Sequence, residues 1–152
     1  MKPAAHNGCM HVPYETEKFY YGFPVYILAY PDDAVGVGIT TGSSSYSLGQ
    51  MVMIGCDSTT HAARSIKRSG VCSLNLFGPE AMGLFEYAGT ISGGNKLCDA
   101  HVASSNYDGV PGLDDSQMSL VCRVLEATED GTYTHFRCEI TQRLVAPALI
   151  DE

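Results

Sequence analysis

Hydroxyl side chains gather in two short segments of the sequence, residues 40–47 and residues 58–60, and Arg64 follows the second. The second segment precedes a predicted helix, whose first N–H groups and dipole attract anions. The hydroxyls add hydrogen-bonding groups, and an arginine one turn into a helix can bind phosphate with its planar fork. The pattern therefore suits a phosphate joined to a larger polar ring. Ser and Thr also gather in loops for a simpler reason, because they stabilise turns and helix caps.

Other ligand-binding patterns find little support in the sequence. It contains neither G-x-G-x-x-G nor the P-loop pattern G-x-x-x-x-G-K-[ST], so it does not favour a Rossmann or nucleotide-hydrolase site. His6, Cys9 and His11 lie close together, but their spacing matches no common metal site, and we predict no metal.

The charge balance argues against nucleic acid as a partner. The formal net charge is −8, which repels phosphate backbones. Arg64, Lys67 and Arg68 form the one small basic group near the hydroxyl segments, and a phosphorylated cofactor would depend on such placed cations. No apolar run reaches the length of a membrane span, so no membrane partner is predicted.

The cysteines indicate a reducing compartment. None of the six belongs to a C-x-x-C pair, and the N-terminus lacks the apolar region of a signal peptide. We therefore expect reduced, buried thiols and a cytoplasmic location.

Short apolar runs rich in β-branched and aromatic residues predict a mainly β chain. Residues 31–33 should form a turn between the first two strands, and residues 129–131 should join the last two as a hairpin. Residues 42–49 and 89–117 are expected to be mostly loop. The predicted strands are residues 25–30, 35–41, 51–56, 71–76, 118–127 and 132–144.

Two short helices are predicted between these strands. The first covers residues 61–69, with Asp57 or Ser58 as its N-cap and Gly70 as its C′ residue. The second covers roughly residues 80–87, with Pro79 near its first position.

This spacing of strands and turns predicts a closed β-barrel of about six strands with two or three short helices. The length of 152 residues fits one domain, and 45% hydrophobic residues supply a core. We assign residues 1–18 to an N-terminal arm and residues 19–152 to the domain.

The order of several motifs resembles the flavin reductase-like family, whose members have an FMN-binding split barrel with Greek-key topology. Each motif is weak by itself, but their order and spacing are specific, and the likeness covers roughly residues 19–145. The matching pieces are Ser45–Leu48 (SYSL), Met51–Cys56, Ser58–Thr60, Val71–Leu76 with Asn75, Gly109–Leu113 (GVPGL), Leu120–Leu125 and Cys138–Ile140.

The resemblance implies an FMN site and a homodimer. One set of residues would line the isoalloxazine and ribityl side, and a second set would hold the phosphate. Lys96 would then meet flavin, phosphate or substrate, or else be a solvated loop lysine. Phe19–Phe23 would serve the dimer interface or pack in the core. The first set is Thr40, Thr41, Gly42, Ser43, Ser45 and Tyr46, and the second is Ser58, Thr59, Thr60 and Arg64.

Three positions depart from the family pattern. Gln50 replaces a proline, and Cys138 replaces a glycine, where it would narrow the flavin site or fill the core. Tyr133 replaces a histidine that is linked to nicotinamide binding in some members of the family, although His135 lies nearby.

Two functions follow from the resemblance. The first is an NAD(P)H-dependent oxidoreductase that transfers a hydride to FMN, and the alternative is a flavoredoxin-like electron carrier that meets a protein partner. A third possibility is a barrel that binds another ligand or acts as an interaction module. The departure at Tyr133 weakens the case for nicotinamide use more than the case for FMN.

Overall fold

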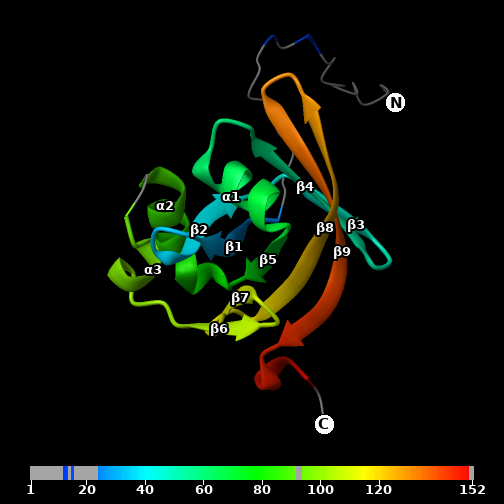
Figure 1. The fold of residues 1–152 in the computed structure, drawn as a ribbon. Helices are drawn as coiled ribbons and strands as arrows, with labels where there is room; N and C mark the ends of the chain where they lie inside the picture. The colour runs from blue at the N-terminus through cyan, green and yellow to red at the C-terminus, as the bar shows by residue number, and fades with distance from the viewer. Residues whose placement is uncertain (1–11, 14, 16–23, 92–93, 151–152) are drawn as a thin grey trace, which may run out of the picture.

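A long antiparallel sheet organises the protein in the computed structural model, which describes residues 12–13, 15, 24–91 and 94–150 (Figure 1). Three α-helices and two 3-10 helices lie between or after the strands of this described part. The elements are β1 (Tyr26–Asp32), β2 (Gly36–Gly42), β3 (Ser45–Leu48), β4 (Met51–Asp57), α1 (His61–Ser69), β5 (Val71–Leu76), η1 (Pro79–Ala81), α2 (Met82–Thr90), α3 (Lys96–Asp99), β6 (Ser104–Tyr107), β7 (Val110–Leu113), β8 (Met118–Asp130), β9 (Tyr133–Val145) and η2 (Pro147–Leu149).

The main sheet has seven strands in the order β2-β1-β5-β8-β9-β4-β3, and β6 and β7 pair separately. Consecutive strands are thus often far apart in the sheet, which is the Greek-key pattern. The two edge strands β2 and β3 follow each other in the chain, with only Ser43 and Ser44 between them. The Ser44 carbonyl accepts hydrogen bonds from Gly55 N at 2.9 Å and from the Tyr26 hydroxyl at 3.1 Å, so it links both sides of this gap.

The barrel is therefore split and not closed. No ladder of hydrogen bonds joins β2 to β3 in the described chain, which corrects the closed barrel expected from strand spacing alone. The mainly β, split-barrel fold with short helices is confirmed.

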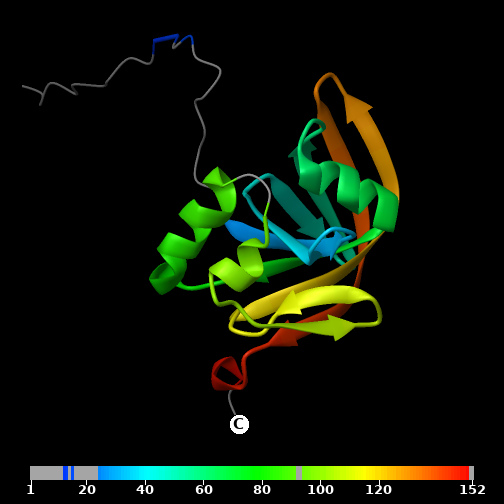
Figure 2. The same ribbon diagram turned by 60° about the vertical axis from the view of Figure 1, so that its left-hand side comes forward.

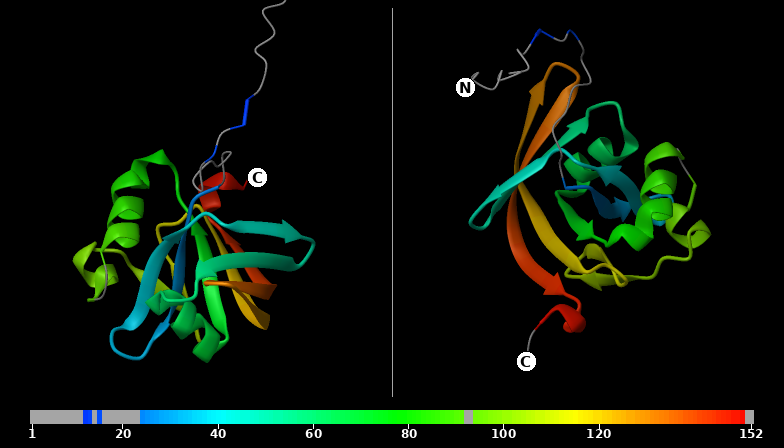
Figure 3. Two further views of the ribbon diagram at one scale, coloured as in Figure 1. Left: turned by 90° about the horizontal axis from the view of Figure 1, so that it is seen from above. Right: turned by 180° about the vertical axis from the view of Figure 1, so that it is seen from behind.

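Strand β1 is apolar from Tyr26 to Tyr30 because both of its faces are covered there. Tyr26, Leu28 and Tyr30 pack inside the barrel, in a core shared with β4, α1, β5, β8 and β9. Ile27 and Ala29 pack on the other face against β2, α2 and β7. Figure 3 shows α2 and α3 together on one side of the molecule and the long β8–β9 hairpin on the opposite side.

Helix α1 spans the residues that the sequence predicts, and its C-cap Gly70 has the expected left-handed conformation, with φ of 74°. The predicted N-cap is wrong. Thr60 is the N-cap, and its hydroxyl accepts a hydrogen bond from Ala63 N at 3.2 Å. Asp57 instead accepts from Thr59 N at 2.9 Å, so it stabilises the turn that precedes the helix.

All six predicted strands are present, but three more strands form where loops were expected. Residues 42–49 contain β3, and residues 89–117 contain β6, β7 and α3. Figure 2 shows the β6–β7 hairpin below the main sheet. The predicted turn at residues 31–33 is also displaced, because β1 continues to Asp32 and β2 begins at Gly36. The second helix is a 3-10 turn at η1 followed by α2.

Several predictions lie outside the described residues. Most of the N-terminal arm, the His6, Cys9 and His11 group, and Phe19–Phe23 belong to this part, and the domain boundary stays a prediction. Five cysteines in the described chain carry free thiols. None of the described helices combines the length and apolar character needed to cross a membrane.

Candidate functional site

A cavity of about 580 Å³ lies where the β1–β2 hairpin meets the start of α1, the end of α2 and α3. Its volume is within the usual range for small-molecule sites. Part of its wall is apolar, formed by Val35 and Ile39 of the hairpin, Ala62 of α1, and Ala88 and Ile91 near the end of α2. Such a wall suits the apolar face of a flat aromatic ring.

The α1 side of the cavity is suited to an anion. Thr59, Thr60 and Arg64 line it together. One guanidinium nitrogen of Arg64 donates to the Thr59 carbonyl, which fixes the exposed side chain close to the helix start. The first N–H groups of any helix lack partners within the helix, so they point outward with the positive end of the dipole.

Lys96 lies on the other side of the cavity, at the first residue of α3. Its ammonium donates to the carbonyls of Ala88 at 3.0 Å and Ile39 at 3.4 Å, so it joins α2 to β2. Partial burial lowers the pKa of Lys96. The side chain is therefore not a solvated loop lysine. Ser92 and Gly93, which precede α3, lie outside the described residues, whereas Gly94 lines the cavity.

Among the cavity residues that were not predicted from the sequence, two form a hydrogen-bonded pair. Asp32 ends β1 and His61 begins α1, and Asp32 Oδ2 lies 2.6 Å from His61 Nε2. Both line the cavity, beside Tyr30. Burial and the neighbouring Asp32 raise the pKa of Tyr30 to about 12. No local pattern signals this pair, because 29 residues separate its members.

The cavity thus brings together five of the predicted site residues: Thr40, Thr59, Thr60, Arg64 and Lys96. The other six lie outside its lining, and several have clear structural contacts. The Thr41 hydroxyl donates to Phe85 O at 2.6 Å, and Gly42 leaves room for the Tyr26 ring. Ser43, Ser45 and Tyr46 lead into and along edge strand β3, and Tyr46 is 58% exposed. Ser58 bonds to Glu129 and Thr134 of the β8–β9 hairpin at 2.9 and 2.8 Å.

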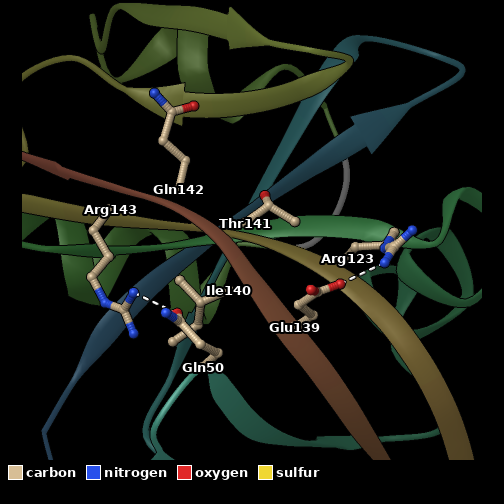
Figure 4. Close-up of a pocket in the computed structure, with 7 residues that line it drawn as sticks. All are labelled: Gln50, Arg123, Glu139, Ile140, Thr141, Gln142 and Arg143. Atoms are coloured by element: carbon tan, nitrogen blue, oxygen red, sulfur yellow. Dashed lines mark hydrogen bonds and ion pairs between the residues drawn. The ribbon is translucent and has the colours of Figure 1, made fainter.

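A second and shallower hollow of about 650 Å³ lies along β9 next to Gln50 (Figure 4). Its charged groups are already paired, Arg123 with Glu139 and Arg143 with Gln50 at 2.7 Å. None of the predicted site residues lines it. We therefore place the candidate site in the cavity at α1, although the hollow on β9 is larger.

The three residues that depart from the family pattern all lie outside the cavity lining. Cys138 is fully buried in the barrel core, so it fills the core and does not line the cavity. Gln50 binds Arg143 at the β4–β9 side. Tyr133 is 58% exposed at the start of β9, and His135 lies 3.5 Å from Asp130 in the same hairpin, also outside the cavity lining.

The fold and the cavity define the class first: a split β-barrel with a cavity where the β1–β2 hairpin meets the start of α1. The description "Flavin reductase like domain" matches residues 19–151. The chain therefore belongs to the flavin reductase-like family, whose members include flavin reductases and flavoredoxins. No curated protein matches the sequence.

Solved structures support the fold at low sequence identity. Flavoredoxin from Methanosarcina acetivorans has a TM-score of 0.84 and 19% identity, over 93% of this chain and 78% of that one. The FMN-binding protein from Thermus thermophilus has a TM-score of 0.78 and 13% identity, over 92% and 81%. The NADH:FAD oxidoreductase of Streptomyces globisporus has a TM-score of 0.73 and 14% identity, over 83% and 77%.

Proposed function

We propose that the protein binds FMN in the cavity at α1 and acts as an NAD(P)H-dependent flavin oxidoreductase. One observation supports the ligand best. The cavity combines an apolar wall with Thr59, Thr60 and Arg64 at a helix start and with Lys96 on its other side. A phosphate suits the first group of residues, and an aromatic ring suits the wall.

The protein's own residues would bind and orient the cofactor. Thr60 and Arg64 would hold the phosphate, Ile39 and Ala62 would contact the ring, and Lys96 would offer a cation near the ring edge. Bound FMN supplies the hydride chemistry, so no protein acid or base is required for the transfer. Apolar residues along the wall would also limit the access of water to the ring.

A flavoredoxin-like electron carrier is the alternative function. Tyr133 and His135 support it, because neither side chain lines the cavity where a nicotinamide would have to approach a flavin. The net charge of −8 also gives a protein partner an acidic surface to recognise.

We further propose that the protein is a homodimer. The outer face of edge strand β3 carries two large exposed apolar side chains, Tyr46 at 58% and Leu48 at 69%. They lie opposite Met53 and Met51 of β4, which form a continuous apolar surface with them. A second copy that covers this surface would remove it from water. Sedimentation velocity of the protein and of Leu48→Lys tests the assembly, with a shift to monomer expected for the variant.

The decisive experiment is an anaerobic titration of the purified protein with FMN and then with NADH or NADPH. Quenched flavin fluorescence and a perturbed absorbance band are the expected signs of binding. Bleaching at a catalytic rate supports the reductase, whereas bound flavin that nicotinamide does not bleach supports the carrier. A protein that takes up no FMN would contradict both.

A further inference from the structure

The Asp32–His61 pair lies in the cavity, but none of the contacts proposed so far uses it. Asp32 is 8% exposed, whereas the side chain of His61 retains 54% of its exposure. The pair joins the end of β1 to the start of α1, one turn from Arg64. The exposed His61 is thus beside the proposed phosphate position, and the buried Asp32 lies on the inner side of His61.

The buried carboxylate determines how the imidazole ring is held. Asp32 Oδ1 accepts hydrogen bonds from the N–H groups of Ala34 at 2.8 Å and Val35 at 3.3 Å. Burial by itself would raise the pKa of Asp32, but the hydrogen bonds from His61, Ala34 and Val35 outweigh it and lower that pKa. An ionised carboxylate only accepts hydrogen bonds, so His61 Nε2 must carry the shared proton.

The other ring nitrogen of His61, Nδ1, has no hydrogen-bond partner among the described residues. We propose that His61 contacts the ligand's phosphate through Nδ1–H, with Asp32 as the positioning residue that holds the ring. This inference rests on the proposed FMN site and adds a residue that determines how strongly the phosphate is bound at each pH.

A protonated imidazole at a helix N-terminus is disfavoured by the dipole, so a partner must offset that charge. Asp32 supplies one negative charge, and a phosphate dianion would supply the second. Histidine is the side chain that ordinarily changes its charge between pH 5 and 8. The contact should therefore be strong at lower pH and weak at higher pH, where Nδ1 presents a lone pair to the phosphate oxygens.

The surrounding charged groups are few. Tyr30 faces His61 from β1, with ring centroids 6.3 Å apart, and Arg64 and Lys96 line the same cavity from α1 and α3. Arg68 of α1 is paired with Asp33 at 3.1 Å. Asp57 at the end of β4 accepts from Thr59. The β2 and α2 residues that line the cavity are uncharged.

The test compares FMN with riboflavin, which has the same ring but no phosphate. Dissociation constants are measured by flavin fluorescence between pH 6.5 and 8.5, where the phosphate is mostly a dianion. We expect His61→Gln to weaken FMN about tenfold at pH 6.5 and less than about twofold at pH 8.5, which is the effect of losing one charge-assisted contact. Riboflavin affinity should change by less than about twofold at either pH.

The outcomes separate this inference from the proposed function. Unchanged FMN affinity in His61→Gln at every pH overturns the inference and leaves the FMN site intact. An equal loss for FMN and riboflavin also overturns it, because His61 would then contact the ring. A wild-type protein that binds neither flavin overturns the proposed function and, with it, this inference.

A second variant tests the positioning role of Asp32. In Asp32→Asn the carboxylate charge that offsets the protonated ring is lost. The phosphate contact of His61 should therefore weaken at pH 6.5 toward its strength at pH 8.5, so that most of its pH dependence disappears. Ring ¹⁵N shifts from NMR provide a readout that a merely structural role would not move. In the wild type we expect protonation at Nε2 alone without ligand and at both nitrogens with FMN. If FMN leaves the His61 ring shifts unchanged, the inference is wrong.

Discussion

Arg64 is the side chain on which the proposed phosphate contact depends most directly. We expect Arg64→Ala to weaken FMN binding by about tenfold or more, because a hydrogen bond to a charged group contributes about 1.5–3 kcal/mol. Arg68→Ala is the matched control, since Arg68 lies on the same helix but pairs with Asp33 at 3.1 Å. Fluorescence titration measures both variants. An Arg64→Ala protein with wild-type affinity would remove this residue from the site.

Asn75 acts on the fold rather than on the ligand. It is fully buried, and its amide donates to Ile27 O at 3.0 Å, while its carbonyl oxygen accepts from Leu113 N at 3.0 Å and Ser119 Oγ at 2.6 Å. These bonds attach β5 to β1, β7 and β8 in the buried interior. The asparagine that the family pattern singles out is thus a structural joint between strands.

We expect Asn75→Leu to lower the free energy of unfolding by about 3 kcal/mol, because it leaves several buried groups without partners. Asn106→Ala is the control: its exposed side chain accepts one bond from Gly109 N at 2.8 Å, so its loss should be below about 1 kcal/mol. Urea unfolding measures both, and equal losses would show that burial of the network contributes nothing.

At the scale of the element, α1 depends on its C-cap as well as on its N-cap. Gly70 has φ of 74° and nothing within 4 Å of the position of an added Cβ. We therefore expect Gly70→Ala to destabilise the protein by about 1 kcal/mol through backbone strain alone. Gly83 of α2 has equal space but no positive φ, so Gly83→Ala should stabilise by roughly 0.5–1 kcal/mol. Denaturant melts of the two variants should shift in opposite directions, and shifts of the same sign would contradict the argument.

Elements with strong local signals are the ones that the sequence predicts well. The six strands with apolar runs lie within a few residues of their predicted bounds, and so does α1, whose C-cap is Gly70. These strands are β1, β2, β4, β5, β8 and β9. Strand β3 was missed because its sequence is SYSL at an exposed sheet edge, where little apolar pattern is needed. Strand β7, VPGL, contains both a proline and a glycine and is fixed by tertiary contacts to Asn75.

The site was predictable only where its residues are neighbours in sequence. Thr59, Thr60 and Arg64 share a helix start, and they do line one cavity. Asp32 and His61 meet only because the β1–β2 hairpin folds against α1, and no spacing rule encodes that contact. Ser58 carries a hydroxyl, as Thr59 and Thr60 do, but it hydrogen-bonds to Glu129 and Thr134, which the sequence pattern cannot reveal.

At the scale of the whole molecule, the barrel encloses a group of thiols. Cys72, Cys122 and Cys138 are fully buried, and Cys72 lies directly opposite Cys122 in the β5–β8 pair. Burial raises the pKa of Cys122 to about 12. The interaction with Cys138 and, after it, burial raise the pKa of Cys72 well above its ordinary value. Because the thiolate is the reactive form, Cys72 and Cys122 should be inert while the barrel is intact.

Labelling of these thiols should therefore report the opening of the whole barrel. In the folded protein at pH 8 we expect a thiol reagent to modify exposed Cys98 quickly, and Cys72 and Cys122 only at the rate set by global unfolding. FMN at one hundred times its dissociation constant should slow the labelling of the buried pair about a hundredfold, because it stabilises the folded state by about 2.7 kcal/mol. Peptide mass spectrometry assigns each site, with Cys98 as the internal control whose rate FMN leaves unchanged. If Cys72 reacts as fast as Cys98, the barrel opens locally at β5–β8, and ligand and core are not coupled through one cooperative unit.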